Sequence, residues 1–152
     1  MDLRWHHYTF EQLDVHLLYA ILALRQEVFV VEQTCYYQDA DGRDQAALHV
    51  VGILGDQLMA YTRVLDRGIA YPDYASIGRV VTSPAGRGRG WGRPLMQESL
   101  RVLYRHYGPQ AVKISAQAHL QDFYGSLGFR PVGEGYEEDG IPHWGMVLPS
   151  PI

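Results

Sequence analysis

The sequence predicts a mixed α/β fold, in which helices cover both faces of a mostly antiparallel sheet. Apolar runs of strand length alternate along the chain with runs that have helical spacing. Gly-Asp and Asp-Gly pairs separate neighbouring strand-like runs, as they do in tight hairpins. The 152 residues, 47% of them hydrophobic, suffice to bury a core without disulfides or a structural metal, so we expect one domain spanning residues 1–152.

The first third of the chain is expected to contain a strand, a helix and an irregular segment. The strand is Leu3 to Tyr8. Thr9 to Gln12 has the spacing of a capping box, which predicts a helix that runs to about Glu27. The Asp-rich stretch from Tyr36 to Asp44 has no regular pattern. The apolar residues expected on the buried face of the helix are Leu13, Leu17, Ile21 and Leu24.

The middle of the chain is expected to form three strands and a longer helix. Gly55-Asp56 is a tight hairpin signal between the first two strands. The helix begins near Gly92, where Pro94 suits its first turn, and stops at Gly108-Pro109. The strands are Leu48 to Leu54, Gln57 to Leu65 and Ala75 to Thr82, and the helical positions are Leu95, Met96, Leu100, Leu103 and Tyr107.

The last third is expected to contain a strand, a short helix and a final strand pair. Ala111 to Ala116 is the strand, and Leu120 to Leu127 is the helix, which Gly128 ends. The final pair, Phe129 to Tyr136 and His143 to Leu148, turns around Asp139-Gly140.

The segment from residue 79 to residue 93 combines glycines with arginines and holds no acidic residue. Its glycines let the backbone turn tightly and point several N–H groups at one place. The helix that follows adds unpaired N–H groups and the positive end of its dipole. In a chain of net charge −4, this segment predicts a site for a multiply charged phosphate. The glycines are Gly86, Gly88, Gly90 and Gly92, and the arginines are Arg79, Arg87, Arg89 and Arg93.

Two common phosphate-binding motifs do not fit this segment. A nucleoside-triphosphate loop needs a lysine beside its last glycine, but the only lysine of the chain is Lys113. A dinucleotide fingerprint counted from Gly88 has Arg93 where its third glycine belongs. The pattern that remains is R-x-x-G-x-G at residues 87–92.

This pattern resembles motif A of the GNAT superfamily, whose members are acyl-coenzyme A dependent N-acyltransferases. Ala116 to Phe129 resembles motif B of the same superfamily, with Tyr124 and the Gly128-Phe129 pair at the expected separation. The stretches LRQEVFVVEQ at 24–33 and YEEDGIPHWGM at 136–146 further resemble the bacterial ElaA-like branch. The resemblance covers most of the chain and implies the GNAT fold.

The resemblance also implies acetyl-coenzyme A as the cosubstrate, with its pyrophosphate held by the loop. In GNAT proteins, main-chain N–H groups of the strand before this loop meet the thioester carbonyl. Gln117 stands where many members have Asn, so we assign it no coenzyme contact. The implied coenzyme-binding residues are Val80, Val81, Thr82, Arg87, Gly88, Arg89, Gly90, Trp91, Gly92 and Arg93.

Acyl transfer from a thioester to an amine needs an acid for the leaving thiolate and a base for the amine. Tyr124 is the expected acid, since a phenol of pKa about 10 can protonate a thiolate of pKa about 8.5. Glu32 is the expected base, because burial after the apolar run VFVV would raise its pKa toward neutrality. His119 and His143 are alternative bases, since histidine titrates near neutral pH.

An acceptor amine that arrives protonated would be attracted by carboxylates. The chain has one acidic segment between residues 32 and 44 and another between residues 134 and 139. A small polyamine, an amino sugar or an amino acid would each suit such a site, and the sequence does not choose among them. The residues expected to bind the acceptor are Asp41, His119 and His143.

The composition argues against several other classes of function. A net charge of −4 argues against nucleic-acid binding, which needs a broad basic surface. The longest apolar run, Leu17 to Leu24, is too short to cross a bilayer, and the first residues do not resemble a signal peptide. The single Cys35 and the other histidines lack the spacing of metal ligands. We therefore expect a cytoplasmic protein without a metal.

The expected function is acetyl-coenzyme A dependent N-acetylation of a small-molecule amine. Direct transfer in a ternary complex is expected, because Cys35 lies outside the matching motifs and no nucleophile–base pair is evident. A catalytically silent module that binds acyl-coenzyme A and senses it is the main alternative. A longer acyl donor also remains open. A homodimer is a further alternative, because no exposed apolar patch can be read from a sequence.

Overall fold

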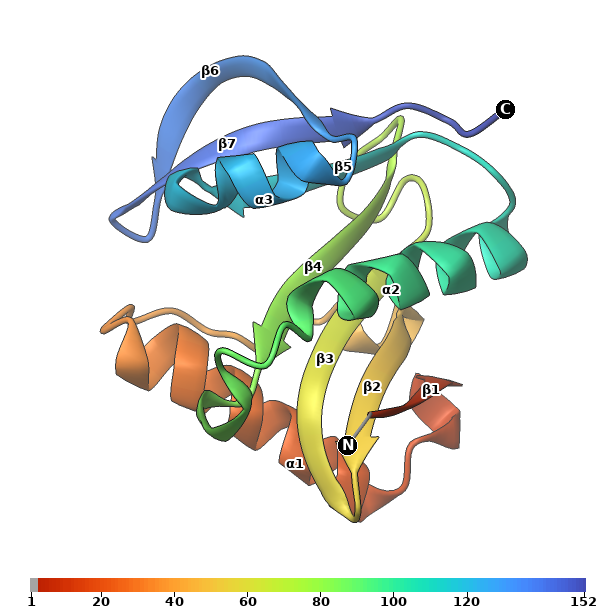
Figure 1. The fold of residues 1–152 in the computed structure, drawn as a ribbon, viewed down its shortest axis with the longest axis vertical. Helices are drawn as coiled ribbons and strands as arrows, with labels where there is room; N and C mark the ends of the chain where they lie inside the picture. The colour runs from red at the N-terminus through yellow and green to blue at the C-terminus, as the bar shows by residue number, and fades with distance from the viewer. Residues whose placement is uncertain (1–2) are drawn as a thin grey trace.

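The computed structural model describes residues 3–152, which contain one seven-stranded sheet with the strand order β1-β2-β3-β4-β5-β7-β6 (Figure 1). Neighbouring strands are antiparallel except for β4 and β5, which are parallel. The prediction of a mixed, mostly antiparallel sheet is confirmed. The strands are β1 (Arg4–Thr9), β2 (Leu48–Leu54), β3 (Gln57–Leu65), β4 (Ala75–Thr82), β5 (Val112–Gln117), β6 (Arg130–Glu138) and β7 (Ile141–Leu148).

Helices cover both faces of the sheet because successive side chains of a strand point to opposite sides. Val50 of β2 belongs to the buried cluster that includes residues of α2 (Gly92–Tyr107) and α3 (Gln121–Ser126). The next residue, Val51, belongs to a second cluster with residues of α1 (Val15–Arg25). Figure 1 shows α1 on the opposite side of the strands from α2.

The start of the first helix differs from the prediction. The Thr9 N–H donates to the Gln12 side chain at 2.9 Å, as in a capping box, but only the 3₁₀ turn η1 (Phe10–Gln12) follows. The chain then returns to an extended conformation before Asp14, whose carboxylate accepts from the Leu17 N–H at 2.7 Å and caps α1. A carboxylate both accepts this hydrogen bond and opposes the positive end of the helix dipole, so α1 begins here.

The end of this helix also differs from the prediction of about Glu27. α1 continues as the π-helical segment η2 (Gln26–Glu32), a rare geometry that is frequent at functional sites. The valines of the run VFVV are β-branched and favour strands over helices, so the sequence did not predict a helical extension here. The wide turns bury Val28 against the sheet and carry Glu32 to the rim of a cavity.

β4 contains a bulge opposite the middle of β3. Arg79 and Val80 of β4 face the single residue Thr62 of β3, between regular pairs on either side. Arg79 has a φ of 51°, a left-handed conformation that costs a non-glycine residue free energy. A bulge leaves its extra residue outside the hydrogen-bond ladder and bends the strand.

The sheet divides just before the bulge. β4 and β5 pair at one end, where the last matched residues are Ser76 and Lys113. The next residue of each strand, Ile77 on β4 and Ile114 on β5, lines a cavity. The wedge between the two strands therefore opens a space inside the sheet, and other segments of the chain form its walls.

A buried ion network joins the loop before β2 to the helix and strands beneath it. Arg25, at the end of α1, is 0% exposed. Its Nε and Nη1 donate to the carboxylates of Asp39 and Asp44, each at 2.8 Å. Asp44 also begins the 3₁₀ turn η3 (Asp44–Ala46). Because a buried charge is costly without a partner, this network fixes the loop on the helix end.

The same network includes the bulge residue. Arg63 of β3 donates to both carboxylate oxygens of Asp41, at 2.7 and 2.9 Å. The Nε of Arg79 lies 2.7 Å from the Asp39 carboxylate, and its guanidinium lies over the Tyr37 ring. The network therefore holds the strained bulge in place.

Residues 3–152 contain no helix whose length and apolar content would let it cross a bilayer.

Candidate functional site

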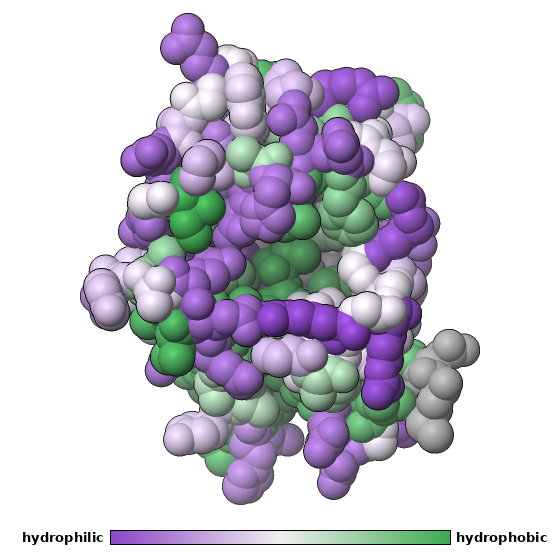
Figure 2. Space-filling model, turned by 60° about the vertical axis from the view of Figure 1, so that its left-hand side comes forward, coloured by the Kyte–Doolittle hydropathy of each residue, from purple (hydrophilic) through white to green (hydrophobic). Residues whose placement is uncertain are grey.

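The cavity in the wedge between β4 and β5 has a volume of about 700 Å³ and is lined by residues of five parts of the chain. Figure 2 shows a hollow with a hydrophobic floor and a mostly hydrophilic rim. This size and lining suit a small-molecule site. The contributing parts are η2 with the loop after it, β4 with the following loop, β5, the segment of residues 118–124, and the β6–β7 turn with the start of β7.

One end of the cavity meets the glycine–arginine loop. Gly88 and Gly90 have φ values of +82° and +74°, which explains why glycine occupies these positions. Within residues 3–152, no main-chain acceptor bonds the amides of residues 88–90. The N-cap of α2, Trp91, provides no side-chain cap. Free loop amides therefore adjoin an uncapped helix N-terminus, an arrangement that binds anions.

The side chains of three residues expected to bind the coenzyme contact other parts of the protein. Trp91 is buried, and a Cβ on Gly86 would lie only 2.3 Å from its ring. Arg89 lies over the Trp91 ring at 5.2 Å, and Arg93 donates to Ser126 Oγ at 2.6 Å. Of the ten expected coenzyme-binding residues, those that line the cavity are Val80, Val81, Thr82 and Arg87.

Glu32 forms an ion pair across the rim of the cavity. Both of its carboxylate oxygens accept from the Arg87 guanidinium, at 2.9 and 2.5 Å. The hydrogen bonds from Arg87 lower the pKa of Glu32, and 43% of its side chain is exposed. The expectation that burial raises this pKa is therefore wrong. The apolar run before Glu32 packs on the sheet, but the π-helical turn directs the carboxylate outward.

Tyr124 lines the cavity from α3 and is 6% exposed. Its ring packs edge-on against Phe123 and Phe129, at centroid distances of 5.1 and 6.0 Å. Burial raises the pKa of Tyr124 to about 12, so the phenol stays protonated near neutral pH. Its hydroxyl is a weaker acid than that of a free tyrosine, and it keeps a proton to donate.

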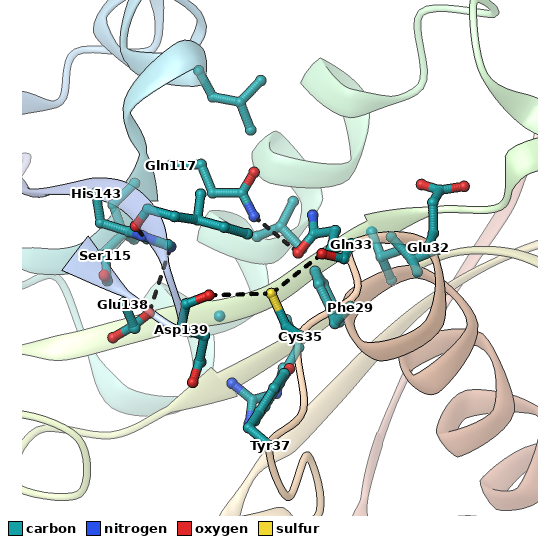
Figure 3. Close-up of a pocket in the computed structure, with 18 of the residues that line it drawn as sticks. Phe29, Glu32, Gln33, Cys35, Tyr37, Ser115, Gln117, Glu138, Asp139 and His143 are labelled. Carbon is teal, nitrogen blue, oxygen red and sulfur yellow. Dashed lines mark hydrogen bonds and ion pairs between the residues drawn. The ribbon is translucent and has the colours of Figure 1, made fainter.

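The other end of the cavity is closed where the segment after η2 contacts β5 and the β6–β7 turn (Figure 3). The Gln117 side chain donates to the Gln33 side chain at 3.3 Å. The Cys35 thiol lies 3.4 Å from the Asp139 carbonyl oxygen. These contacts join residues that are 84 and 104 positions apart in sequence, so only the fold assembles this wall.

His143 is the buried histidine of this end. Its Nδ1 donates to the Ile141 carbonyl at 2.6 Å, and its Nε2 lies 3.5 Å from the Glu138 carboxylate (Figure 3). His119 also lines the cavity but is exposed on η5 (Ala118–Leu120). Both histidines expected at the acceptor end therefore line the cavity, in different environments.

Asp41, the third residue expected to bind the acceptor, also lines the cavity. Burial alone raises the pKa of Asp41, but the hydrogen bonds from Arg63 reverse this effect and lower it well below its usual range. Because Arg63 and Arg79 contact this carboxylate, its charge is balanced inside the protein. The sequence could not show this, because the arginine partners come from β3 and β4.

Sequence reasoning missed several residues that line the cavity. Tyr37 lies within the irregular stretch after η2, and Ser115 lies within β5. Gln117, which was assigned no coenzyme contact, lines the cavity and donates to the Gln33 side chain just after η2. The alternation of β5 could have indicated that Ser115 and Gln117 share a face, but nothing local marks that face as the wall of a cavity. In the part of the chain that the structure describes, no group of histidine, cysteine or acidic residues could hold a metal ion.

Comparison with known proteins assigns the family. The sequence profile described as an acetyltransferase (GNAT) domain matches residues 8–149. The chain belongs to the GNAT acetyltransferase family. Protein ElaA of Escherichia coli K12 is 47% identical over 147 residues, which cover 95% of each chain. The resemblance to the ElaA-like branch is therefore confirmed.

Solved GNAT structures agree with this assignment. The crystal structure of an acyl-CoA N-acyltransferase from Pseudomonas aeruginosa superposes with a TM-score of 0.89 at 44% identity, covering 96% of this chain and 99% of that one. The crystal structure of Escherichia coli ElaA has the same TM-score at 45% identity and the same coverage. The predicted GNAT fold is confirmed, and membership of the family supports an acyl-transfer function.

Proposed function

We propose that this GNAT protein transfers an acetyl group from acetyl-coenzyme A to a primary amine of a small acceptor. The observation that carries the proposal is the wedge between β4 and β5. An anion-binding loop adjoins one end of it, and a chamber with a buried histidine forms the other. A donor bound by its phosphates at the loop can extend its thioester into the wedge toward an acceptor in the chamber.

The donor end is supported by main-chain groups. The free amides of residues 88–90 and the N-terminus of α2 would bind the pyrophosphate, with Arg87 beside them. Val80 lines the cavity at the bulge, where the strand ladder is interrupted, so its N–H can polarise the thioester carbonyl. Val81 and Thr82 continue this wall of the cavity.

The transfer is proposed to be direct. Tyr124 donates a hydrogen bond to the sulfur as it leaves, because its buried phenol retains its proton. Cys35 is buried, and its thiol contacts the main-chain carbonyls of Gln33 and Asp139. No general base contacts this thiol in the described chain, so an acyl-cysteine intermediate has no support.

Calorimetry and an amine panel test this function. We expect saturable binding of acetyl-coenzyme A and coenzyme A, and release of free thiol when spermidine, glucosamine or lysine is added as acceptor. Binding without thiol release from any of these amines would favour a coenzyme sensor instead. Absence of binding up to about millimolar ligand, the weak end of the usual affinity range, would remove the basis of both readings.

Replacing Glu32 by Gln is expected to strengthen coenzyme binding. Arg87 is shared between Glu32 in the free protein and the proposed pyrophosphate site, so removing its partner makes the guanidinium available. An exposed ion pair of this kind corresponds to a change in the dissociation constant of about two- to fivefold. Calorimetry with coenzyme A measures this change.

Glu27→Gln is the matched control, because it removes the same charge from an exposed side chain close enough to influence Arg87 without bonding it. We expect a smaller effect from this variant. In an Arg87→Ala background, Glu32→Gln should have no effect on affinity. An equal gain with and without Arg87 would show that the loss of charge acts through general electrostatics alone.

A further inference from the structure

We infer that His143 takes the proton from the acceptor amine and that Glu138 acts through it, as the positioning residue that stabilises the imidazolium once it forms. This inference rests on the proposed acetyl transfer, for which it names the base. His143 lies on β7, and Glu138 lies at the end of β6 across the hairpin turn. Both residues line the cavity at the end away from the glycine–arginine loop.

The hydrogen bonds of His143 decide which nitrogen is free to accept a proton. A carbonyl oxygen can only accept, so the 2.6 Å contact with the Ile141 carbonyl requires a proton on Nδ1. In the neutral imidazole the lone pair is therefore on Nε2. Nε2 is the nitrogen nearest to Glu138, at 3.5 Å, so an imidazolium formed there has a carboxylate beside it.

Packing fixes the orientation of the ring. The Tyr136 ring stacks on the imidazole with a centroid distance of 6.1 Å and an interplanar angle of 20°. The Tyr136 hydroxyl in turn contacts Ser115 Oγ on β5. The His143 side chain is 8% exposed, so it has little freedom to turn away. A base held in this way needs no reorganisation before the reaction.

The groups around this histidine favour a cationic acceptor. Glu138 and Asp139 approach from β6 and the turn, and Tyr136 lies on one face of the ring. Gln117, the registered neighbour on β5, is neutral. Cys35 approaches from the loop after η2 and contacts the Asp139 carbonyl. The carboxylates attract an ammonium group to the nitrogen that is to remove its proton.

The other candidate bases are less well placed. Arg87 lowers the pKa of Glu32, which makes this carboxylate a weaker base. Arg79 and Arg63 occupy the Asp41 carboxylate. His119 is exposed on η5, where no hydrogen bond within residues 3–152 orients its ring.

The proposed steps balance in protons and bonds. The ammonium gives one proton to His143 Nε2, and the neutral amine then forms a C–N bond with the thioester carbonyl carbon. The C–S bond breaks as the tetrahedral intermediate collapses. Tyr124 gives its phenolic proton to the departing sulfur. The acceptor nitrogen then gives its second proton to the Tyr124 oxygen, which restores the phenol. His143 finally releases its proton to solvent, which leaves the amide, free coenzyme A and one proton.

The pH dependence of His143→Gln tests this assignment with whichever amine of the panel reacts fastest. We expect kcat/KM to fall about 100-fold near pH 7, the usual scale for loss of a general base. The loss should shrink toward about pH 10, where the amine, with a pKa similar to that of lysine, is deprotonated without help. The dissociation constant for acetyl-coenzyme A and the melting temperature serve as controls for the fold. A loss that is the same at every pH would overturn the assignment.

Glu138→Gln tests the role of the carboxylate beside His143, and its side chain is exposed. It remains a test of the proposal if His143→Gln fails to fold. We expect kcat to fall several-fold with the KM for acetyl-coenzyme A unchanged. Glu137→Gln removes the same charge from the adjacent strand residue, which points to the other face, and should leave kcat unchanged. Equal rates for Glu138→Gln and the wild type would overturn the proposal.

His119→Gln separates the two histidines. The proposal expects this variant to keep the pH profile of the wild type. Should the pH-dependent loss appear in His119→Gln rather than in His143→Gln, the exposed histidine is the base and the proposal is overturned. If neither the wild type nor any variant acetylates an amine, the proposed function itself fails. That result differs from an active wild type whose rate does not change in His143→Gln, which would overturn only the role of His143.

Discussion

Replacing Asp44 by Asn is expected to lower the free energy of unfolding by about 3 to 5 kcal/mol, the usual cost of breaking a buried ion pair from one side. The Asp44 carboxylate contacts Arg25 at 2.8 Å and Arg63 at 3.0 Å, and both arginines are buried. Asparagine keeps the shape but removes the charge, which leaves the network with an excess positive charge out of contact with water. Urea denaturation measures the change.

Asp73→Asn is the matched control, because Asp73 is exposed in the loop before β4. A surface change of this kind is expected to stay within about 0.5 kcal/mol. If Asp44→Asn also stayed within that limit, the network would not hold the loop.

The pH dependence of stability gives the same pair of proteins a second readout. Burial alone raises the pKa of Asp44, but the hydrogen bond from Arg25 reverses this effect and leaves it lowered. A lowered folded-state pKa contributes stability that is present above the unfolded value of about 3.9 and is lost as the pH falls below it. Between about pH 5 and pH 2, we therefore expect the wild type to lose more stability than Asp44→Asn, because the variant has no carboxylate to protonate.

Replacing Tyr124 by Phe is expected to lower turnover by about 10- to 100-fold, up to the lower limit of the roughly 100- to 10,000-fold contribution of a general acid. The change removes the hydroxyl that stabilises the departing sulfur and leaves the packing on Phe123 and Phe129 intact. Thiol release with the fastest amine of the panel measures turnover. Calorimetry should find coenzyme binding unchanged, because the proposed pyrophosphate site lies on the loop and α2.

Tyr104→Phe is the matched control for Tyr124→Phe. Tyr104 is a half-buried tyrosine of α2, and it does not line the cavity. Removing its hydroxyl should leave both turnover and coenzyme affinity unchanged. Turnover by Tyr124→Phe at the rate of the wild type would remove Tyr124 from its proposed role.

The elements with strong local signals were predicted closely. β2, β3, β4 and α2 have the bounds expected from their patterns, because Gly55-Asp56 fixes a hairpin and Gly108-Pro109 stops a helix. The elements from β5 to β7 begin and end within two residues of their predicted limits. Weak signals failed at the first helix, where Asp14 replaced the capping box as the starting point and a π-helical extension had no recognisable period.

The candidate site was predicted in its parts but not in its connections. The glycine–arginine loop and Tyr124 stand in local patterns that can be recognised without a structure. The state of a carboxylate depends on its partner, and the partner of Glu32 is 55 residues away in sequence. The arginines that balance Asp41 lie 22 and 38 residues away in sequence, and the sequence did not show them, because such ion pairs form between segments that only folding brings together.

The sequence by itself determined the family, the order of the strands and helices, and the loop suited to a phosphate, because these depend on glycine geometry, apolar spacing and motifs of neighbouring residues. Only the tertiary structure decided where β4 leaves β5, which acids are neutralised by buried arginines, and which histidine has a free nitrogen in the cavity. Those features depend on the burial of each group and on the charges beside it, both of which are set by contacts across the fold.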